Sequence, residues 1–280
     1  MAFPISICTE VIRDLEFRAQ CILAHQLGYD GMEVAPFTLS ETPHRLAPAA
    51  IAEFRSVAAE EGTAVSGLHW LLASPAGLSI TSTDPSVFNK TVDVGCRLVA
   101  LCAELGGAYL VHGSPAQRQL APGHEEEGRK RGVAYFAAMA EAATEAGLRY
   151  YIEPLARKST GFVTRIEEAL AIIDAIGSPA LGTMVDCYAA ASNGEDIPAL
   201  LRQWVPKGVI RHVHLNDPNG RGPGEGKLPF APIMNALSAL GYTGTMAIEP
   251  FIYEPDGPAS AARSIGYIRG IIEAGIVSGD

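Results

Sequence analysis

Residues Glu125–Pro154, EEEGRKRGVAYFAAMAEAATEAGLRYYIEP, contain the structural unit that repeats along this chain. Its first part, Glu125–Ala146, has the composition and apolar spacing that are typical of a helix. Gly147 follows at the position where helices commonly end. The apolar run Tyr150–Pro154 then predicts a strand, and an acid, Glu153, stands at its end. The stretch therefore predicts a helix followed by a strand that ends in an ionisable side chain.

The same unit recurs along the whole chain of 280 residues. Short apolar runs predict eight strands: Pro4–Thr9, Gly31–Ala35, Ala64–Leu71, Ala108–His112, Tyr150–Pro154, Gly182–Asp186, Ile210–Leu215 and Thr245–Pro250. The stretches between and after them predict eight helices: Arg18–Leu27, Pro48–Glu61, Ser86–Leu105, Glu125–Ala146, Arg165–Ile176, Ile197–Gln203, Ala231–Leu240 and Ala259–Ala274. Strict alternation of strands and helices gives a parallel sheet. Eight units in a chain of this length suit a closed (β/α)8 TIM barrel better than an open doubly wound sheet. We expect an α/β protein with a single barrel domain over residues 1–280.

The charge of the chain indicates which class of partner it binds. The chain carries a formal net charge of −10 and has no basic stripe, which argues against a protein that binds nucleic acid through many phosphate contacts. A small-molecule substrate is the better expectation.

Cysteine usage and the N-terminus predict a cytoplasmic protein. The five cysteines are odd in number and form no C-x-x-C pair, which favours reduced thiols over a disulfide framework. The first residues lack the basic and apolar regions of a signal peptide. No apolar run approaches the roughly 20 residues that span a bilayer, so we expect no membrane association.

Every predicted strand ends at an ionisable residue. These residues are Glu10, Glu33, His69, His112, Glu153, Asp186, His214 and Glu249. The carboxyl ends of the strands carry the active site in essentially every characterised barrel enzyme. Because carboxylates gathered in an enclosed site repel one another and lose hydration, their convergence predicts a bound cation.

The last four of these residues, Glu153, Asp186, His214 and Glu249, form the sharpest subset. Three carboxylates and one imidazole suit Mn²⁺, Mg²⁺ or Co²⁺, whereas Zn²⁺ is less favoured because no cluster of thiolates or histidines recruits it. Strand alternation points Cys187 away from the pocket. His212 shares the face of His214 and is expected one layer deeper in the barrel.

An ordered set of short motifs resembles the xylose isomerase-like barrel superfamily, which contains sugar and sugar phosphate isomerases and epimerases as well as apurinic endonucleases. The motifs occur in family order over nearly the whole chain. They are Ile152–Leu155, Met184–Asp186, His212–Asp217, Pro223–Gly226, Gly241–Gly244 and Ile248–Pro250.

The resemblance implies an enzyme with one divalent metal ion, Mn²⁺ first. It implies Glu153, Asp186, His214 and Glu249 as metal ligands, and Glu153 and Glu249 as the catalytic acid and base. The implied reaction is isomerisation or epimerisation of a sugar, sugar acid or sugar phosphate. A proton is transferred next to a metal-chelated carbonyl through a cis-enediolate. Association of outer helices into a homodimer or homotetramer is common among proteins of this kind.

Departures from the family motifs matter for the choice of substrate. Ala189 stands where the apurinic endonucleases and the ketose 3-epimerases carry a histidine. The endonucleases also carry an Asp-x-His where Pro218 and Gly220 stand, which argues against a DNA-repair nuclease. The 3-epimerases carry a glutamate at the position of Ser159 and an arginine at that of Gly220, so a different sugar pocket is expected.

Candidate substrate contacts lie at strand ends and in the loops after them. They are His69, Trp70, His112, Arg157, Lys158 and Arg221. Two rival functions remain open. One is a metal-dependent lyase or dehydratase on the same site, of the inosose dehydratase or C-glycoside-cleaving type. The other is a non-catalytic sugar-binding barrel. Product mass separates the lyase from the isomerase, and independence of metal would identify the binding protein.

Overall fold

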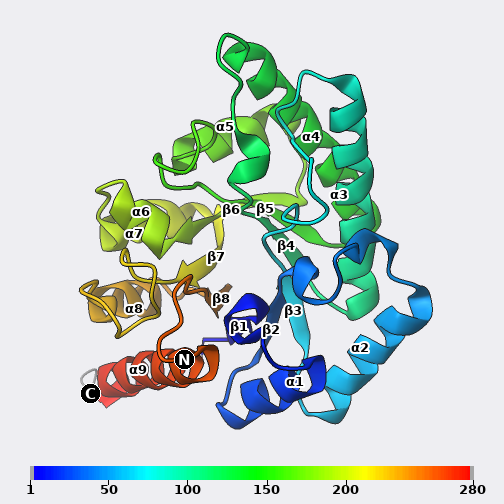
Figure 1. Ribbon diagram of the computed structural model, residues 1–280. Coiled ribbons are helices and arrows are strands. Elements are labelled where there is room, and N and C mark those ends of the chain that lie inside the picture. Colours follow the sequence, from blue (N-terminus) through cyan, green and yellow to red (C-terminus); the bar gives the residue numbers. More distant parts are fainter. Residues whose placement is uncertain (1–2, 278–280) are drawn as a thin grey trace.

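The computed structural model describes residues 3–277. Within them, eight parallel strands close into a barrel in chain order, and the last strand pairs with the first (Figure 1). The strands are β1 (Ile5–Cys8), β2 (Gly31–Val34), β3 (Val65–Leu68), β4 (Tyr109–His112), β5 (Arg149–Ile152), β6 (Leu181–Asp186), β7 (Ile210–Leu215) and β8 (Thr245–Ile248). The predicted (β/α)8 barrel is confirmed.

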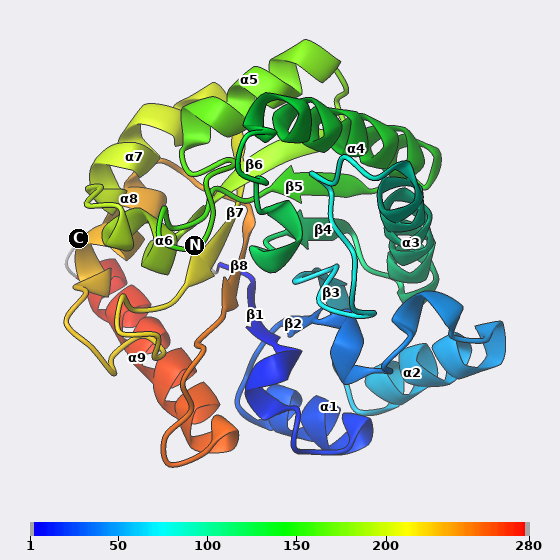
Figure 2. The ribbon, with the colours of Figure 1, turned by 45° about the horizontal axis from the view of Figure 1, so that its top comes forward.

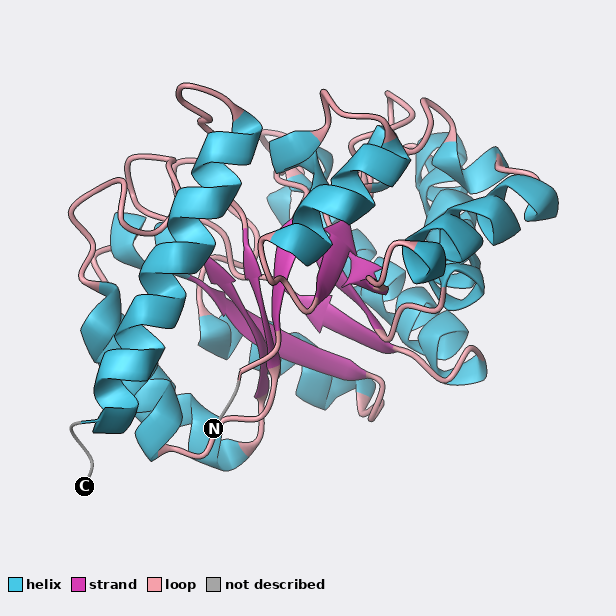
Figure 3. Ribbon diagram, turned by 90° about the horizontal axis from the view of Figure 1, so that it is seen from below, coloured by secondary structure: helices cyan, strands magenta, loops and turns pink. Residues whose placement is uncertain are grey.

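The α-helices surround the barrel and cover the outer faces of the strands (Figures 2 and 3). They are α1 (Phe17–Gln26), α2 (Pro48–Glu60), α3 (Pro85–Leu105), α4 (Glu125–Glu145), α5 (Ile166–Ile176), α6 (Cys187–Ser192), α7 (Ile197–Trp204), α8 (Phe230–Ala239) and α9 (Gly257–Val277). Short 3-10 segments interrupt the loops: η1 (Thr9–Ile12), η2 (Pro36–Thr38), η3 (Pro43–Arg45), η4 (Ala116–Arg118) and η5 (Val205–Lys207).

Local signals explain where α3 begins and ends. The side chain of Asp84 accepts a hydrogen bond from the backbone N–H of Ser86 at 2.8 Å and so caps the first turn. Gly106 ends the helix with a φ of 86°, a left-handed conformation that glycine adopts without a steric penalty. The chain then enters β4 three residues later.

Strand alternation sorts the side chains between the barrel interior and the helix layer. In β4, β5 and β6, four inward-facing residues form a small buried cluster of their own, separate from the larger core under the helices: Tyr109, Val111, Tyr151 and Met184. The ring of His212, from β7, packs against Tyr109 and Tyr151 in this cluster. His212 therefore lies in the interior, below the carboxyl ends of the strands.

Two further sequence expectations concern cysteines and membranes. All five cysteines lie within the described residues and are free, and Cys187 belongs to the apolar core as predicted. Among residues 3–277, no helix combines the length and the apolar character that crossing a membrane requires.

Candidate active site

The four predicted ligands come together at the carboxyl ends of β5 to β8. Glu153, Asp186, His214 and Glu249 are all buried, with exposed fractions of 3%, 3%, 0% and 6%. Each can offer one ligand atom such that these atoms lie within 4.8 Å of one another. We call these four residues the acid cluster.

The imidazole of His214 is central to the acid cluster. Its Nδ1 lies 2.9 Å from Oε2 of Glu249, 3.8 Å from Oε1 of Glu153 and 3.9 Å from Oδ2 of Asp186. Within the described residues this buried nitrogen has no hydrogen-bond partner of suitable geometry. A ring nitrogen that gives up its proton, together with three carboxylates, is a donor set that fits a divalent cation.

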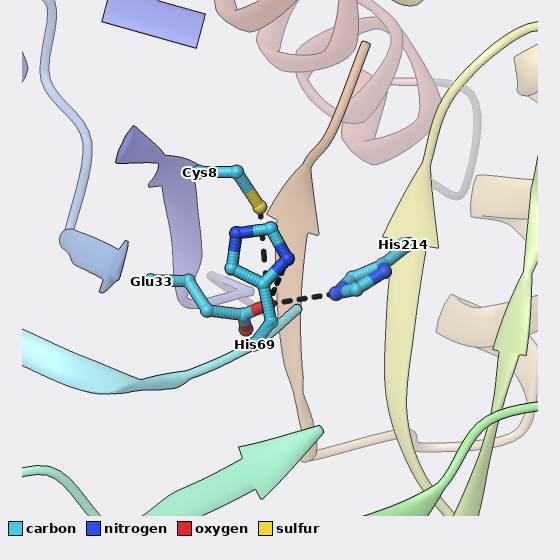
Figure 4. A group of neighbouring side chains, drawn as sticks. All are labelled: Cys8, Glu33, His69 and His214. Atoms are coloured by element: carbon cyan, nitrogen blue, oxygen red, sulfur yellow. Dashed lines mark hydrogen bonds and ion pairs between the residues drawn. The ribbon is translucent and has the colours of Figure 1, made fainter. Parts of the chain in front are cut away.

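Below the acid cluster, the buried carboxylate of Glu33 faces the other side of the His214 ring (Figure 4). Nε2 of His214 lies 2.7 Å from Oε1 of Glu33, and Nε2 of His212 lies 3.0 Å from Oε2. The hydroxyl of Tyr109 donates to Oε2 at 2.5 Å. Burial raises the pKa of Glu33, but the charges and hydrogen bonds of His212 and His214 outweigh burial and hold the pKa well below its ordinary value. Glu33 is therefore an anion that accepts the Nε2 proton of His214 and leaves Nδ1 directed at the acid cluster.

His69, which follows β3, lies between two carboxylates. Its Nδ1 is 3.1 Å from Oε1 of Glu249, and its Nε2 is 2.8 Å from Oε2 of Glu10. Burial lowers the pKa of His69, but Glu10 and the other carboxylates outweigh burial and raise the pKa to about 10. The imidazole is thus positively charged and holds Glu249 in place.

Asn216 connects two acids of the cluster. Its side-chain amide donates to Oδ2 of Asp186 at 2.7 Å and to Oε2 of Glu249 at 3.3 Å. The other oxygen of Asp186 accepts from the backbone N–H of Ala189 at 2.6 Å and caps α6. Burial and the charges of Glu153 and Glu249 raise the pKa of Asp186 well above its ordinary value. Nearby negative charge of this kind is what a bound cation would neutralise.

Gly113, directly after β4, leaves the space that Glu153 occupies. A Cβ atom at Gly113 would lie 1.7 Å from Oε2 of Glu153. Any larger residue would therefore displace this carboxylate from the acid cluster.

Not all of the predicted substrate contacts lie in the site. His69 lies in the site, with both ring nitrogens facing carboxylates. The ring of His112 instead packs against Tyr135 and Phe136 of α4. The reason is strand parity, because His112 is one residue beyond the inward Val111 and so points toward the helix layer.

The remaining predicted contacts lie in loops. Trp70 makes edge-to-face contacts with Phe37 and Phe251. Arg157 and Lys158 are exposed. Arg221 is paired with Glu254 in the loop after β8.

The pairing of Glu33 with His214 and the role of Asn216 were missed from the sequence. Glu33 was recognised only as a strand-end acid. Asn216 lies two residues beyond His214 and therefore on the same face of the chain, and this signal could have placed it beside the ligands.

Known proteins resemble this chain over most of its length. The sequence profile of the xylose isomerase-like TIM barrel family matches residues 21–271. The L-ribulose 3-epimerase of Mesorhizobium japonicum is 27% identical over 183 residues, which cover 64% of this chain but only 60% of the relative. The fructoselysine 3-epimerase of Shigella flexneri is 23% identical over 249 residues, which cover 86% of this chain and 87% of the relative.

A solved structure of L-ribulose 3-epimerase has the same barrel. It matches with a TM-score of 0.82 at 24% sequence identity, over 99% of this chain and 97% of the other. Since the profile match spans most of the sequence, the chain belongs to the xylose isomerase-like TIM barrel family.

Proposed function

We propose that this chain is a divalent-metal-dependent sugar epimerase or isomerase that moves a proton on the carbon next to a ketose carbonyl. The observation that carries the proposal is the acid cluster, in which Nδ1 of His214, without a hydrogen-bond partner of suitable geometry among the described residues, faces three buried carboxylates. Glu153, Asp186, His214 and Glu249 would hold the ion, and Mn²⁺ suits their oxygen-rich set. When bound, such an ion acidifies the carbon next to a chelated carbonyl.

Glu153 and Glu249 are the proposed base and acid. Glu153 is fixed beside Gly113, and Glu249 is held by His69 and Asn216, so neither carboxylate needs to reorganise before it accepts a proton. The two acids come from β5 and β8, on different sides of β6 and β7. One carboxylate can then remove a proton from a substrate carbon while the other returns a proton to the opposite face.

The names of the relatives support a ketose as the substrate. Both curated relatives described above are named as 3-epimerases, one of a pentulose and one of a ketose that carries an amino acid. Epimerisation at the carbon adjacent to the carbonyl is the reaction that a pair of opposed carboxylates performs.

Isosteric substitution of the two glutamates tests the proposal. Glu153→Gln and Glu249→Gln should each abolish incorporation of solvent deuterium into a ketose, because the amide cannot accept the proton. The measurement is mass spectrometry or NMR of D-fructose and L-ribulose incubated in D₂O with the Mn²⁺-loaded protein.

A matched control is Glu104→Gln, which makes the same change at an exposed position of α3 and should exchange at the wild-type rate. Exchange at the wild-type rate in either active-site variant would refute the assignment of acid and base. Release of water or of an aglycone, seen as a lower product mass, would instead identify a lyase.

A further inference from the structure

Four aromatic side chains form a continuous arc at the mouth of the barrel. Phe37 and Trp70 have ring centroids 5.6 Å apart, Trp70 and Phe251 are 6.4 Å apart, and Phe251 and Tyr188 are 5.1 Å apart. All three contacts are edge-to-face, with interplanar angles between 75° and 88°. We call these four residues the aromatic arc.

The aromatic arc is built directly onto the acid cluster. Trp70 follows His69, Tyr188 lies two residues after Asp186, and Phe251 lies two residues after Glu249. The backbone N–H of Tyr188 donates to the side-chain oxygen of Asn216 at 2.7 Å. The side-chain NH₂ of Asn216 in turn donates to Asp186 of the acid cluster. The aromatic arc is therefore joined to the acid cluster and to His69 by one or two residues of chain at three of its four positions, and by these hydrogen bonds.

The backbone of Trp70 shows that the arc is a built feature. Its φ of 48° is left-handed, a conformation that costs a bulky residue energy and persists only where the surroundings impose it. The conformation places the indole between Phe37 and Phe251. Strain held next to a cluster of ionisable groups is typical of a ligand-binding position.

The rings of the aromatic arc keep part of their apolar surface free for a ligand. An aromatic side chain buries about 150–250 Å² when it is fully covered, and Phe251 is 38% exposed while the other three are half-buried. The exposed part of Phe251 is therefore available to a ligand that extends beyond the acid cluster.

Polar groups at one end of the aromatic arc favour a sugar over a purely apolar group. Nζ of Lys158 lies 4.6 Å from the centroid of the Tyr188 ring, so an ammonium group borders this end of the arc, and Tyr188 itself carries a phenol hydroxyl. Sugars present apolar C–H faces and hydroxyl edges, and this mixture matches rings bordered by such donors.

We propose that the aromatic arc is a subsite for a second sugar ring, so that the substrate is a ketose bearing a glycosyl group at the end remote from its carbonyl. The inference rests on the proposed function for the ketose half of the ligand. Ring faces of Trp70 and Phe251 pack on the second sugar, and Lys158 binds its hydroxyl groups.

Two ketoses that differ only in the second ring test the inference. D-fructose and isomaltulose, which is D-fructose with a glucosyl group on O6, are titrated into the Mn²⁺-loaded protein by calorimetry. Isomaltulose should bind at least about fivefold more tightly, as expected for one or two ring-stacking contacts. Trp70→Ala and Phe251→Ala should each reduce this ratio toward one, because each removes a ring that packs on the second sugar.

The control variant is Tyr267→Ala, which removes an exposed aromatic ring on α9 that contacts Phe230 rather than the arc, and it should keep the wild-type ratio. Phe251 is the more exposed of the two test positions, so Phe251→Ala remains informative if Trp70→Ala fails to fold. Equal affinity of the wild-type protein for both sugars, or a ratio that survives both substitutions, would overturn the inference.

Deuterium exchange into the two sugars separates this inference from the proposed function. A preference for isomaltulose without exchange in either sugar would support the subsite and refute the proposed epimerase. Exchange in both sugars without any preference would refute the subsite alone.

Discussion

At the residue scale, His214 links two sets of groups through its two ring nitrogens. Nδ1 faces the acid cluster, and Nε2 lies 2.7 Å from Glu33 in the barrel interior. A carboxylate behind a metal-binding histidine fixes the tautomer and raises the basicity of the ligand nitrogen. The affinity of the acid cluster for a cation should therefore depend on Glu33, although Glu33 is not among the proposed ligands.

Glu33→Gln should weaken Mn²⁺ binding about 10- to 100-fold, because a neutral amide accepts the Nε2 proton of His214 more weakly than a carboxylate and raises the basicity of the ring less. Calorimetric titration of Mn²⁺ into the metal-free protein measures the change, and circular dichroism checks the fold. Tyr109→Phe removes another hydrogen bond to Glu33 without touching His214, and its effect should be much smaller. An unchanged affinity in Glu33→Gln would show that Glu33 does not position the imidazole.

The sequence could predict which residues stand at the carboxyl ends of the strands, because apolar runs and glycines mark where strands and helices end. It could not predict in which direction every one of these side chains points. The position of a residue along its strand determines how high in the barrel its side chain lies. Whether the side chain points inward or outward depends on alternation along the strand, and a shift of one residue turns His112 outward. The orientation of the His214 ring depends on three-dimensional packing around Glu33, to which no local pattern corresponds.

At the scale of elements, the contact between α3 and α4 depends on a glycine. A Cβ at Gly95 in α3 would lie 2.5 Å from the Tyr135 hydroxyl and 2.6 Å from Sδ of Met139, and both of these α4 side chains are fully buried. Gly95→Ala should lower the free energy of unfolding by about 1–3 kcal/mol through overpacking.

Gly266 in α9 provides the matched comparison, because a Cβ there meets no atom within 4 Å. Gly266→Ala should raise the free energy of unfolding by about 0.4–1 kcal/mol, since alanine restricts the unfolded chain. Urea denaturation of both variants measures the two effects. A Gly95→Ala protein as stable as Gly266→Ala would mean that the helices separate without cost.

The long helices and the order of strands were predictable, whereas the short elements after the strands were not. No pattern in the sequence predicted α6, which has only six residues and begins where Asp186 caps its first turn. Similarly, η1, which begins at Thr9 and contains Glu10, was not predicted. Segments this short carry too few residues for a periodic pattern, and tertiary contacts determine their path.

At the scale of the whole molecule, cation binding should stabilise the fold. The acid cluster brings three carboxylates together in a buried site, and a cation that binds only the folded chain shifts the unfolding equilibrium. Mn²⁺ at a hundredfold excess over its dissociation constant should add about 2.7 kcal/mol to the free energy of unfolding of the EDTA-treated protein.

Differential scanning calorimetry with and without Mn²⁺ measures this gain. Asp186→Asn serves as the comparison, because asparagine still caps α6 but brings no charge to the cation, and its gain should be smaller. Identical melting of the wild-type protein with and without Mn²⁺ would contradict a cation site in the acid cluster.

The division of the site between strands and loops has a consequence for how such a protein can diversify. The acids stand at the ends of barrel strands, where a change in direction would disturb the paired sheet, whereas Phe37, Tyr188 and Phe251 lie beyond the strands. Insertions and exchanges are tolerated far better in loops than in a closed sheet. Grafting these segments between related barrels should therefore transfer the preference for a substrate, while the proposed proton-transfer chemistry stays with the strands.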